Sequence, residues 1–169
     1  MVDEAAFKDL MGSVCCPVTV LTTTTGDGRP HGTTVSSFAS LSLRPAMVTF
    51  ALDRGSELLS HLEISRRAGV NVLADGQCDI ATAFARRGDD KFRGVPWSVD
   101  DGLPRLHGTG GWMVVSVRDF VDGGDHLLVI GDAERAETVP RAPLVYARRT
   151  FGTHSVLGRE RGEVFNPAV

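Results

Sequence analysis

The chain has 169 residues, of which 42% are hydrophobic and 23% charged, a composition typical of one compact globular domain rather than of a disordered chain or a coiled coil. Its 18 basic and 21 acidic residues leave a net charge of −3, so the chain as a whole has no positive field that would hold a nucleic acid. The 19 glycines and 8 prolines predict many turns, and therefore many short strands.

Cysteine usage and the first residues predict a soluble, cytoplasmic protein. Cys15 and Cys16 are adjacent, which strains a disulfide between them, and Cys78 completes no metal-ligand spacing with them. The chain begins with an acidic, mixed stretch instead of the basic and then apolar order of a signal peptide. No apolar run approaches the ~18 residues of a membrane span, so we expect no contact with a membrane.

A helix and a β-hairpin are expected first in the chain. Asp3 can cap the helix, and Pro17 is expected to end it. Its apolar face repeats at i, i+3, i+4 and i+7, with Phe7, Leu10, Met11 and Val14. Residues 18–25 are β-branched almost throughout, and the glycine-rich turn 26–29 precedes a second extended run from His31.

Strands and two short helices alternate in the middle of the chain. We expect strands at 47–52 and 69–73 and a helix at 78–85. Between the two strands, Ser56 is expected to be the N-cap of another helix. The apolar stripe of that helix consists of Leu58, Leu59 and Leu62.

The second half of the chain combines a long loop with three strands. Residues 86–111 are rich in Gly, Asp and Pro and are expected to form a loop anchored by Trp97. Strands are expected at 112–121, 126–137 and 144–148. With six or seven strands, three short helices and no β-α-β alternation, the chain is predicted to be mainly β, a small closed or split β-barrel.

Several common catalytic motifs are absent from the sequence. No GxGxxG follows a strand, the turn at 26–33 lacks the lysine of a P-loop, and there is no GxSxG. The five histidines are scattered singly, without the spacing of metal ligands. We therefore expect no Rossmann dinucleotide site, no serine-hydrolase site and no metal site built by the protein.

The most unusual segment is 32–43, GTTVSSFASLSL, in which hydroxyl side chains stand close together beside a strand. Hydroxyls and consecutive backbone N–H groups can form a neutral cradle for an anion or for the polar edge of a ring. The same composition also suits an ordinary barrel strand with alternating faces. The residues alone leave both interpretations open.

Nine short strings follow one another without large gaps over residues 5–157: VTVLTT, HGTTVSSFASLSLRP, MVTFALDRGS, GVNVLADGQ, FA followed by DKF, GLPRL, GGDHLLVIG and PLVYARRTF. Together they resemble the short-chain flavin reductases of two-component monooxygenases, a family with an FMN-binding split β-barrel of Greek-key type. The resemblance implies a flavin reductase-like domain over residues 1–157, followed by a C-terminal tail at 158–169. It also implies a homodimer.

The resemblance implies a site for FMN or FAD. The family segment that touches the isoalloxazine edge and ribityl chain matches Thr33, Thr34, Val35, Ser36 and Ser37. Its phosphate-binding segment matches Asp53, Arg54 and Ser56, where free N–H groups at a helix start and an arginine suit a phosphate. Many members carry a lysine where this chain has Gly55, so Arg54 is expected to supply the charge. Positions near the ring or along the flavin tail match Asn71, Leu73, Lys91 and Phe92.

The resemblance also implies contacts to the nicotinamide dinucleotide at His126, Arg149 and Phe151. Many relatives have tyrosine in place of Phe151, which leaves stacking on the ring as the contact available there. Two of the candidates have plainer alternatives. His126 could bond a backbone carbonyl at the start of its strand, and Lys91 could be an isolated surface lysine.

The implied activity is NADH- or NADPH-dependent reduction of FMN or FAD, with hydride passing from nicotinamide C4 to flavin N5. No residue is given a certain catalytic role, because the protein's share is to hold two rings within reach of each other. The reduced flavin is expected to diffuse to a partner flavin-dependent monooxygenase. Two alternatives are a barrel flavoprotein that retains its FMN and reduces another acceptor, and a non-catalytic flavin-binding module.

Overall fold

A computed structural model describes residues 2–88 and 90–154, so the predicted tail at 158–169 lies outside the described residues. The described residues form three α-helices, one 3₁₀ helix and twelve strands. In chain order they are α1 (Glu4–Gly12), β1 (Cys16–Pro17), β2 (Thr19–Thr24), β3 (Pro30–Val35), β4 (Ala39–Leu43), β5 (Ala46–Asp53), α2 (Glu57–Ser65), β6 (Arg67–Val72), α3 (Cys78–Ala85), η1 (Asp90–Phe92), β7 (Trp97–Asp100), β8 (Leu103–Leu106), β9 (Gly111–Gly123), β10 (His126–Thr138), β11 (Val145–Ala147) and β12 (Thr150–Gly152). The fold is mainly β, as predicted.

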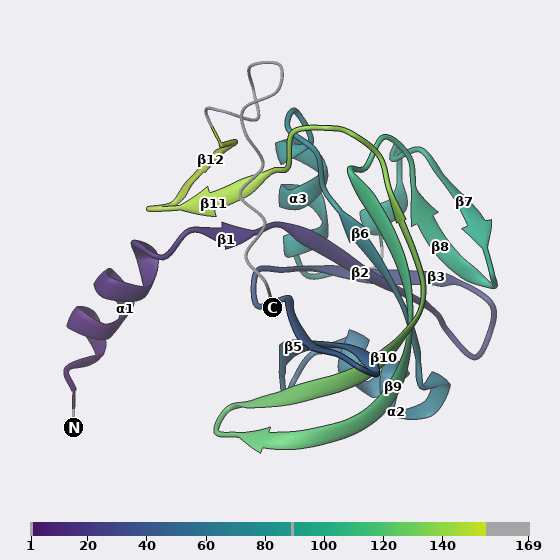
Figure 1. Cartoon of the computed structure of the whole chain (residues 1–169), viewed down its shortest axis with the longest axis horizontal. Coiled ribbons are helices and arrows are strands. Elements are labelled where there is room, and N and C mark those ends of the chain that lie inside the picture. The colour runs from purple at the N-terminus through teal and green to yellow at the C-terminus, as the bar shows by residue number, and fades with distance from the viewer. Residues whose placement is uncertain (1, 89, 155–169) are drawn as a thin grey trace.

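Seven strands form one curved antiparallel sheet in the order β3-β2-β6-β9-β10-β5-β4 (Figure 1). Its two outer strands, β3 and β4, are consecutive in the chain and are joined by residues 36–38 alone. In this link the hydroxyl of Ser37 donates to the carbonyl of Ala51 at 3.2 Å and accepts the N–H of Ala51 at 2.9 Å. The sheet therefore curls until its two edges meet at this link, as the predicted split barrel requires.

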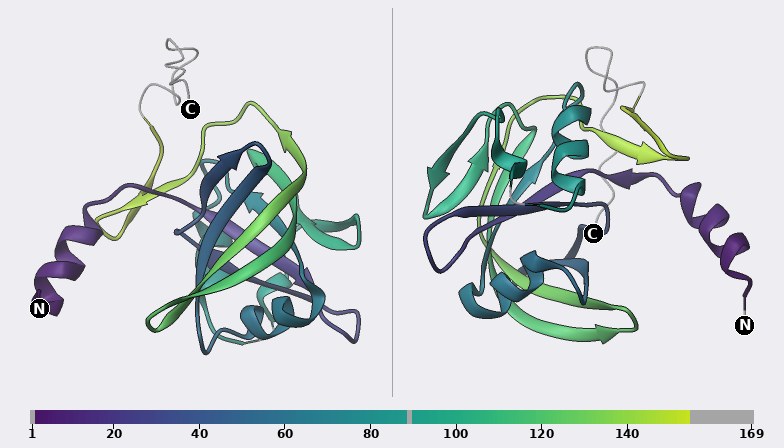
Figure 2. Two further views of the ribbon diagram at one scale, coloured as in Figure 1. Left: turned by 60° about the horizontal axis from the view of Figure 1, so that its bottom comes forward. Right: turned by 180° about the vertical axis from the view of Figure 1, so that it is seen from behind.

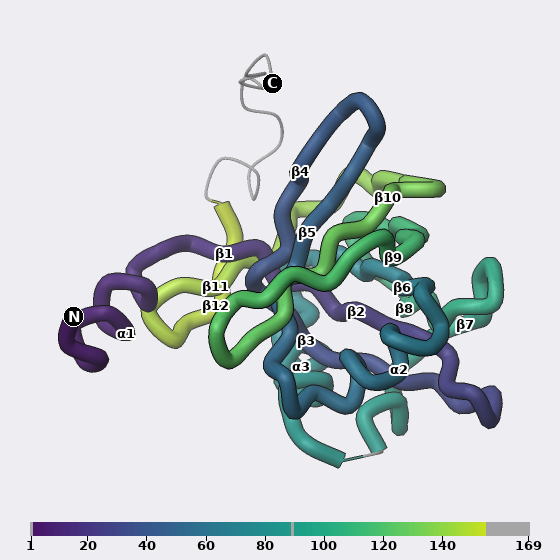
Figure 3. The backbone as a smooth tube through the Cα atoms, turned by 90° about the horizontal axis from the view of Figure 1, so that it is seen from below, coloured from purple at the N-terminus to yellow at the C-terminus, as the bar shows by residue number. Residues whose placement is uncertain are grey.

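The Ser/Thr-rich segment 32–43 belongs to both outer strands. Its first residues complete β3, and its last residues form β4, so the strand interpretation that the composition left open holds at both ends. β4 and β5 make a hairpin that stands out from the rest of the barrel (Figure 3). The segment is thus a structural strand at both ends, and only its middle is irregular.

The longest strands, β9 and β10, have 13 residues each and form a hairpin that extends beyond its neighbours (Figure 2). The turn that joins them lies where the sequence predicts it, and Gly124 adopts the positive φ of 76° that favours glycine. β10 pairs with β5 on its other side, with His126 opposite Asp53. The start of β10 is therefore held beside the end of β5.

Both faces of β2 are buried, which explains its run of apolar and β-branched residues without polar alternation. Leu21 packs in one core cluster with Phe50 of β5 and Leu62 of α2. Its neighbour Val20 packs in the other cluster with Phe84 of α3. The two helices therefore cover opposite faces of the sheet, and both are positioned by burial of their apolar stripes.

The prediction of one long loop at 86–111 is wrong, because this segment contains η1 and the β7–β8 hairpin. Asp101 and Gly102 form the two-residue hairpin turn, with φ values of 52° and 75°. Positive φ at both positions is what the favoured hairpin turn requires, and Asp-Gly is its common sequence. Trp97 does anchor the segment: its ring meets that of Phe92 at 5.4 Å.

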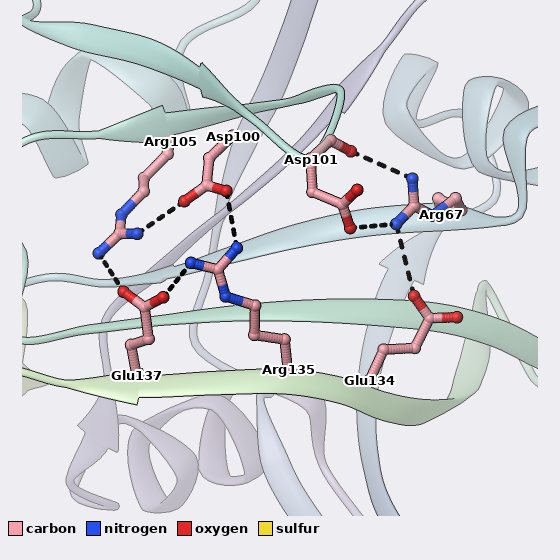
Figure 4. A network of polar contacts seen from close by, with 7 residues as sticks. All are labelled: Arg67, Asp100, Asp101, Arg105, Glu134, Arg135 and Glu137. Atoms are coloured by element: carbon pink, nitrogen blue, oxygen red, sulfur yellow. Dashed lines mark hydrogen bonds and ion pairs between the residues drawn. The ribbon is translucent and has the colours of Figure 1, made fainter.

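Ion pairs fasten the β7–β8 hairpin to the sheet (Figure 4). Asp100 of β7 accepts from Arg105 of β8 at 2.7 Å and from Arg135 of β10 at 2.9 Å. These arginines, Arg105 first, hold the pKa of the Asp100 carboxyl below its ordinary value. In the turn, Asp101 accepts from Arg67 of β6 at 2.6 Å. The hairpin is thus held by residues remote in sequence.

The N-terminal helix α1 projects away from the barrel (Figure 1). Asp3 caps it as predicted, since its carboxylate accepts the N–H of Ala6 at 3.0 Å. The helix ends at Gly12, before the predicted stop at Pro17, which lies in β1. None of the residues of α1 is buried. No described helix is long and apolar enough to cross a membrane.

Candidate functional site

A cleft of about 320 Å³ opens where β3, β5, the start of α2 and the start of β10 meet. The predicted flavin residues that line it are Thr33, Thr34, Val35, Ser36, Ser37, Asp53 and Ser56. His126, predicted for the nicotinamide dinucleotide, lines the same cleft. Ala51 and Leu52 also line it, and the sequence did not single them out because they look like ordinary strand residues. The register of the strand that ends at Asp53 is the signal that could have found them.

The free edge of β3 forms one wall of the cleft. β3 is an outer strand, so half of its backbone N–H and C=O groups face away from β2. Lys91 identifies the free side, because its Nζ donates to the carbonyl of Gly32 at 3.1 Å. Backbone groups two residues apart face the same side of a strand, so the N–H and C=O of Thr34 also lie on the free side. The strand therefore offers a donor and an acceptor to the edge of a planar ligand.

The threonine hydroxyls of β3 have structural partners. Thr33 Oγ1 donates to the carbonyl of Phe84 at 3.3 Å, and Thr34 Oγ1 donates to the carbonyl of Ala81 at 2.7 Å. Both bonds hold α3 against β3. Ser36 is exposed, and its hydroxyl makes no hydrogen bond within the described part of the chain. Among the hydroxyls of residues 33–37, that of Ser36 is therefore the one that remains for a ligand.

A tight turn before α2 forms the opposite side of the cleft. Asp53 organises it: its carboxylate accepts the N–H of Gly55 at 2.7 Å, and its carbonyl accepts the N–H of Ser56 at 2.9 Å. Ser56 is the N-cap of α2, as predicted, but its side chain makes no capping hydrogen bond. Its hydroxyl and the first N–H groups of α2 are therefore donors suited to an anion.

Arg54 leaves this turn in another direction and does not line the cleft. Its Nε donates to the carbonyl of Gly124 at 2.9 Å, and its guanidinium pairs with Asp122 at 2.5 Å. The arginine thereby holds the β9–β10 turn beside the start of α2. Its role as the positive charge for a phosphate stays a prediction.

His126 lines the cleft from β10, where its side chain is half-exposed. Its Nδ1 lies 2.7 Å from the carboxylate of Asp125. This hydrogen bond holds the pKa of the Asp125 carboxyl below its ordinary value. Because Nδ1 is engaged with a side chain and not with a backbone carbonyl, Nε2 is the ring nitrogen left for a ligand.

Two predicted flavin residues, Asn71 and Leu73, lie in the core and do not line the cleft. The amide of Asn71 donates to the carbonyl of Val20 at 3.1 Å and accepts the N–H of Leu106 at 2.7 Å. Leu73 packs in the core cluster beneath α3. Both side chains are committed to the barrel, so any flavin contact from this strand would have to come from its backbone.

Lys91 and Phe92 lie on η1, which crosses β3. Besides the bond from Lys91 to β3, the ring of Phe92 meets the ring of Phe84 at 4.8 Å, edge to face. Lys91 also borders a basic hollow beside the end of α3, together with Arg86, Arg87 and Arg93. Lys91 is thus placed by a specific contact and is not an isolated surface lysine.

Arg149 and Phe151, also predicted for the nicotinamide dinucleotide, lie apart from His126. Both belong to the β11–β12 hairpin, where Arg149 lines a hollow against α1 and the ring of Phe151 meets that of Tyr146 at 4.9 Å. Neither lines the cleft. The described residues of one chain therefore do not bring the three predicted dinucleotide contacts together.

No group of three or more His, Cys, Asp or Glu side chains gathers in a metal-binding arrangement within residues 2–88 and 90–154. The cleft offers backbone groups, hydroxyls and one imidazole, and its one carboxylate, that of Asp53, is engaged by the N–H of Gly55. These groups suit an uncharged planar ring with a polar edge and an attached anion.

Comparison with known proteins identifies relatives along almost the whole chain. Residues 11–155 match the family model described as flavin reductase like domain. The reductase subunit HsaB of a flavin-dependent monooxygenase from Mycobacterium tuberculosis is 35% identical over 154 residues, which cover 89% of this chain and 82% of that protein. An NADH:FMN oxidoreductase from Rhodococcus erythropolis is 37% identical over 149 residues, covering 84% and 77%.

Some relatives are much longer than this chain, which spans about half of their length. A probable flavin reductase from Rhizobium meliloti is 32% identical over 93% of this chain, but the match spans 51% of that protein. Among solved structures, the NADH:FAD oxidoreductase SgcE6 of Streptomyces globisporus, in complex with NAD and FAD fragments, superposes with a TM-score of 0.86. It is 26% identical, and the match covers 90% of this chain and 93% of that one.

Proposed function

Because the chain belongs to the flavin reductase like domain family, we propose that it is an NAD(P)H-dependent flavin reductase acting on FMN or FAD. The observation that carries the proposal is the single cleft shared by the Thr33–Ser37 segment, the start of α2 and His126. Its volume of about 320 Å³ lies at the lower end of the range for small-molecule sites. The edge of β3 suits the polar edge of the flavin ring, the start of α2 suits the phosphate, and His126 faces the space left for the nicotinamide.

The bound flavin would supply the chemistry, since its N5 accepts hydride from nicotinamide C4. The chain's own residues bind the flavin and the nicotinamide dinucleotide and orient the two rings toward each other. The backbone of Thr34 and the hydroxyl of Ser36 bind the polar edge of the ring, and Ser56 with the start of α2 binds the phosphate. Donors fixed along the ring edge also stabilise the negative charge that develops there during hydride transfer. His126 contacts the nicotinamide dinucleotide from β10.

The partners follow from the same proposal. Reduced flavin leaves the cleft for a flavin-dependent monooxygenase, the kind of system that HsaB is named for. The working form is a homodimer in the cytoplasm. Supporting the dimer, α1 exposes apolar side chains that none of the described residues covers, including Phe7 at 52% and Leu10 at 67%.

Steady-state oxidation of NADH and NADPH in the presence of excess FMN or FAD tests the proposal. A reductase turns over free flavin, with saturation in both substrates. Stoichiometric reduction of one retained flavin, without turnover of added flavin, would instead indicate a flavoprotein with another acceptor. Absence of any flavin binding would contradict both.

A matched pair of variants locates the activity in the cleft. Ser36→Ala removes the hydroxyl that remains for a ligand, and we expect a two- to tenfold higher Kd for the flavin, about one hydrogen bond. Ser40→Ala, on the exposed face of β4 and outside the cleft, should leave the Kd unchanged. An equal effect of both variants would place the flavin elsewhere.

A further inference from the structure

A second hollow, of about 300 Å³, lies between the β2–β3 turn, α2 and η1. Its lining residues are Thr25, Arg29, Pro30, His31, Glu57, His61 and Phe92. We call it the histidine pocket. Of these residues, only Phe92 was expected to lie near a cofactor, and the flavin site described above does not use the others.

The histidine pocket continues the flavin cleft along two elements. On β3, Thr33 lines the cleft and His31 lines the pocket, two residues or about 7 Å apart. Between them is Gly32, whose carbonyl accepts from Lys91. At the start of α2, Ser56 lines the cleft and the next residue, Glu57, lines the pocket. A ligand that fills the cleft and extends past Lys91 and Ser56 therefore enters the histidine pocket.

The pocket carries the groups that recognise a nucleoside. His31 is 9% exposed, and its ring meets that of His61 at 5.0 Å with an interplanar angle of 61°. His61 and Phe92, which are partly exposed, offer flat surfaces on which a heteroaromatic base can stack, and the buried His31 supports the ring of His61. Glu57 supplies a carboxylate that can accept from ribose hydroxyls or from an exocyclic amine.

One cation lines the pocket, and a second lies beside the strand that joins the pocket to the cleft. Arg29 contacts Asp27 through Nε alone, so its terminal amino groups remain for a phosphate. Lys91 lines neither the pocket nor the cleft, but its ammonium donates to the carbonyl of Gly32, the residue between His31 and Thr33 on β3. A diphosphate between these two cations would connect a flavin ring in the cleft with a base in the pocket.

We infer that the histidine pocket binds the adenosine diphosphate end of FAD while the flavin ring lies in the cleft, so that the chain prefers FAD to FMN. The inference rests on the proposed function. FMN ends at the phosphate that the start of α2 receives and cannot reach His31 or His61. NADH carries the same adenosine diphosphate group, and the test must separate the two sources.

Quenching of flavin fluorescence measures the Kd of FAD and FMN for the protein and for His61→Ala. We expect FAD to bind the unchanged protein about ten times more tightly than FMN, a difference typical of one well-stacked ring. His61→Ala should raise the Kd of FAD about tenfold and leave that of FMN unchanged. His61 is chosen because it is only partly buried, whereas replacing the buried His31 could unfold the barrel.

The matched control is Ile64→Ala, on the same helix, 83% exposed and outside the pocket, which should change neither Kd. Equal affinity of the unchanged protein for FAD and FMN overturns the inference, as does an equal loss of both affinities in His61→Ala. A thermal melt of each variant confirms that it is folded.

A second experiment measures the KM for NADH with FMN as the electron acceptor. If His61→Ala raises the KM for NADH and leaves the ratio of FAD to FMN affinity unchanged, the pocket binds the adenosine end of NADH and the FAD assignment is wrong. Failure of the proposed function can be told apart from failure of this inference. Even if the protein oxidised no NADH with either flavin, the two flavin titrations would still show whether it binds FAD more tightly than FMN.

Discussion

The imidazole of His126 is held in place by its neighbour in the chain. Its Nδ1 is 2.7 Å from the Asp125 carboxylate, and the backbone of His126 pairs with Asp53 across the β10–β5 ladder. The ring therefore enters the cleft with one nitrogen already engaged. A fixed ring with one remaining nitrogen is suited to a polar contact with a dinucleotide and would lose little entropy on binding.

His126→Ala should raise the KM for NADH roughly two- to tenfold, the value of one hydrogen bond, and leave the Kd of the flavin unchanged. Asp125→Asn serves as the comparison: it weakens the contact that orients the ring, so we expect a smaller increase in the same KM. Steady-state kinetics and a flavin titration give both numbers. A higher Kd for the flavin with an unchanged KM for NADH would assign His126 to the flavin.

Asn71 is a buried residue that joins three backbone segments. Replacing it by alanine leaves the carbonyl of Val20 and the N–H of Leu106 without their partner inside the core. Asn71→Ala should therefore lower the free energy of unfolding by about 1–3 kcal/mol, measured by urea denaturation. Ser40→Ala, at an exposed position, should change it by less than about 0.5 kcal/mol. An unchanged midpoint for Asn71→Ala would contradict the structural role.

Sequence reasoning found most residues of the cleft but not the direction in which every candidate side chain points. The resemblance led to Thr33–Ser37, Ser56 and His126, which the fold then brings together. It could not show that Asn71 points into the core, because the contacts that bury its amide come from β2 and β8, which are distant in sequence. His31 and His61 gave no signal at all, since they are 30 residues apart and meet only when α2 packs beside β3.

At the scale of elements, strands with local turn signals were predicted and strands stabilised from a distance were not. The hairpin of β2 and β3 follows from β-branched runs around a Gly-Asp-Gly turn. The β7–β8 hairpin has an Asp-Gly turn of equal quality, but Arg67 and Arg135, which fasten it to the sheet, come from β6 and β10. The many glycines and prolines in the surrounding sequence made this Asp-Gly turn indistinguishable from a loop.

The turn between β2 and β3 is held by a charged side chain whose effect depends on pH. The hydroxyl of Thr25 donates to Asp27, and Arg29 donates to the same carboxylate at 2.7 Å. These contacts, Thr25 first, lower the pKa of Asp27 from 3.8 to about 2. A carboxyl whose pKa is lowered in the folded state stabilises that state above the unfolded pKa, and the stabilisation is lost as the pH falls through the folded pKa.

The thermal midpoint of the protein should therefore exceed that of Asp27→Asn at pH 5, and the difference should shrink between about pH 4 and pH 2. Melts of both proteins across this range provide the measurement, with NMR titration of the Asp27 carboxyl as a direct check of its pKa. A difference that stays constant or grows on acidification would show that the carboxylate does not act in this way. The effect is small, because the turn is exposed to solvent.

For the molecule as a whole, α1 is the part whose stability residues 2–88 and 90–154 of one chain do not explain. It has nine residues, none of them buried, and a helix of this length is only marginally stable in water without a packing partner. Its apolar stripe is exposed in the described structure, with Phe7, Leu10 and Met11 all at 46% or more; Val14, which the sequence pattern placed in the stripe, follows the end of the helix and is also exposed. None of the three core clusters of the barrel contains a residue of α1. A second copy of the chain is the partner that the proposed homodimer supplies.

Leu10→Glu places a charge in the middle of this stripe. We expect it to convert the dimer to a monomer at micromolar concentration in light-scattering chromatography, because a buried unpaired charge costs more than the interface gains from one leucine. Asp9→Ala lies on the opposite face of α1 and should leave the dimer intact. Neither substitution should lower the urea midpoint at which the barrel itself unfolds, since no residue of α1 belongs to the core of the barrel. A monomeric unchanged protein, or a dimeric Leu10→Glu, would mean that α1 does not hold two copies together, and the separation of Arg149 and Phe151 from His126 would then need an explanation within one chain.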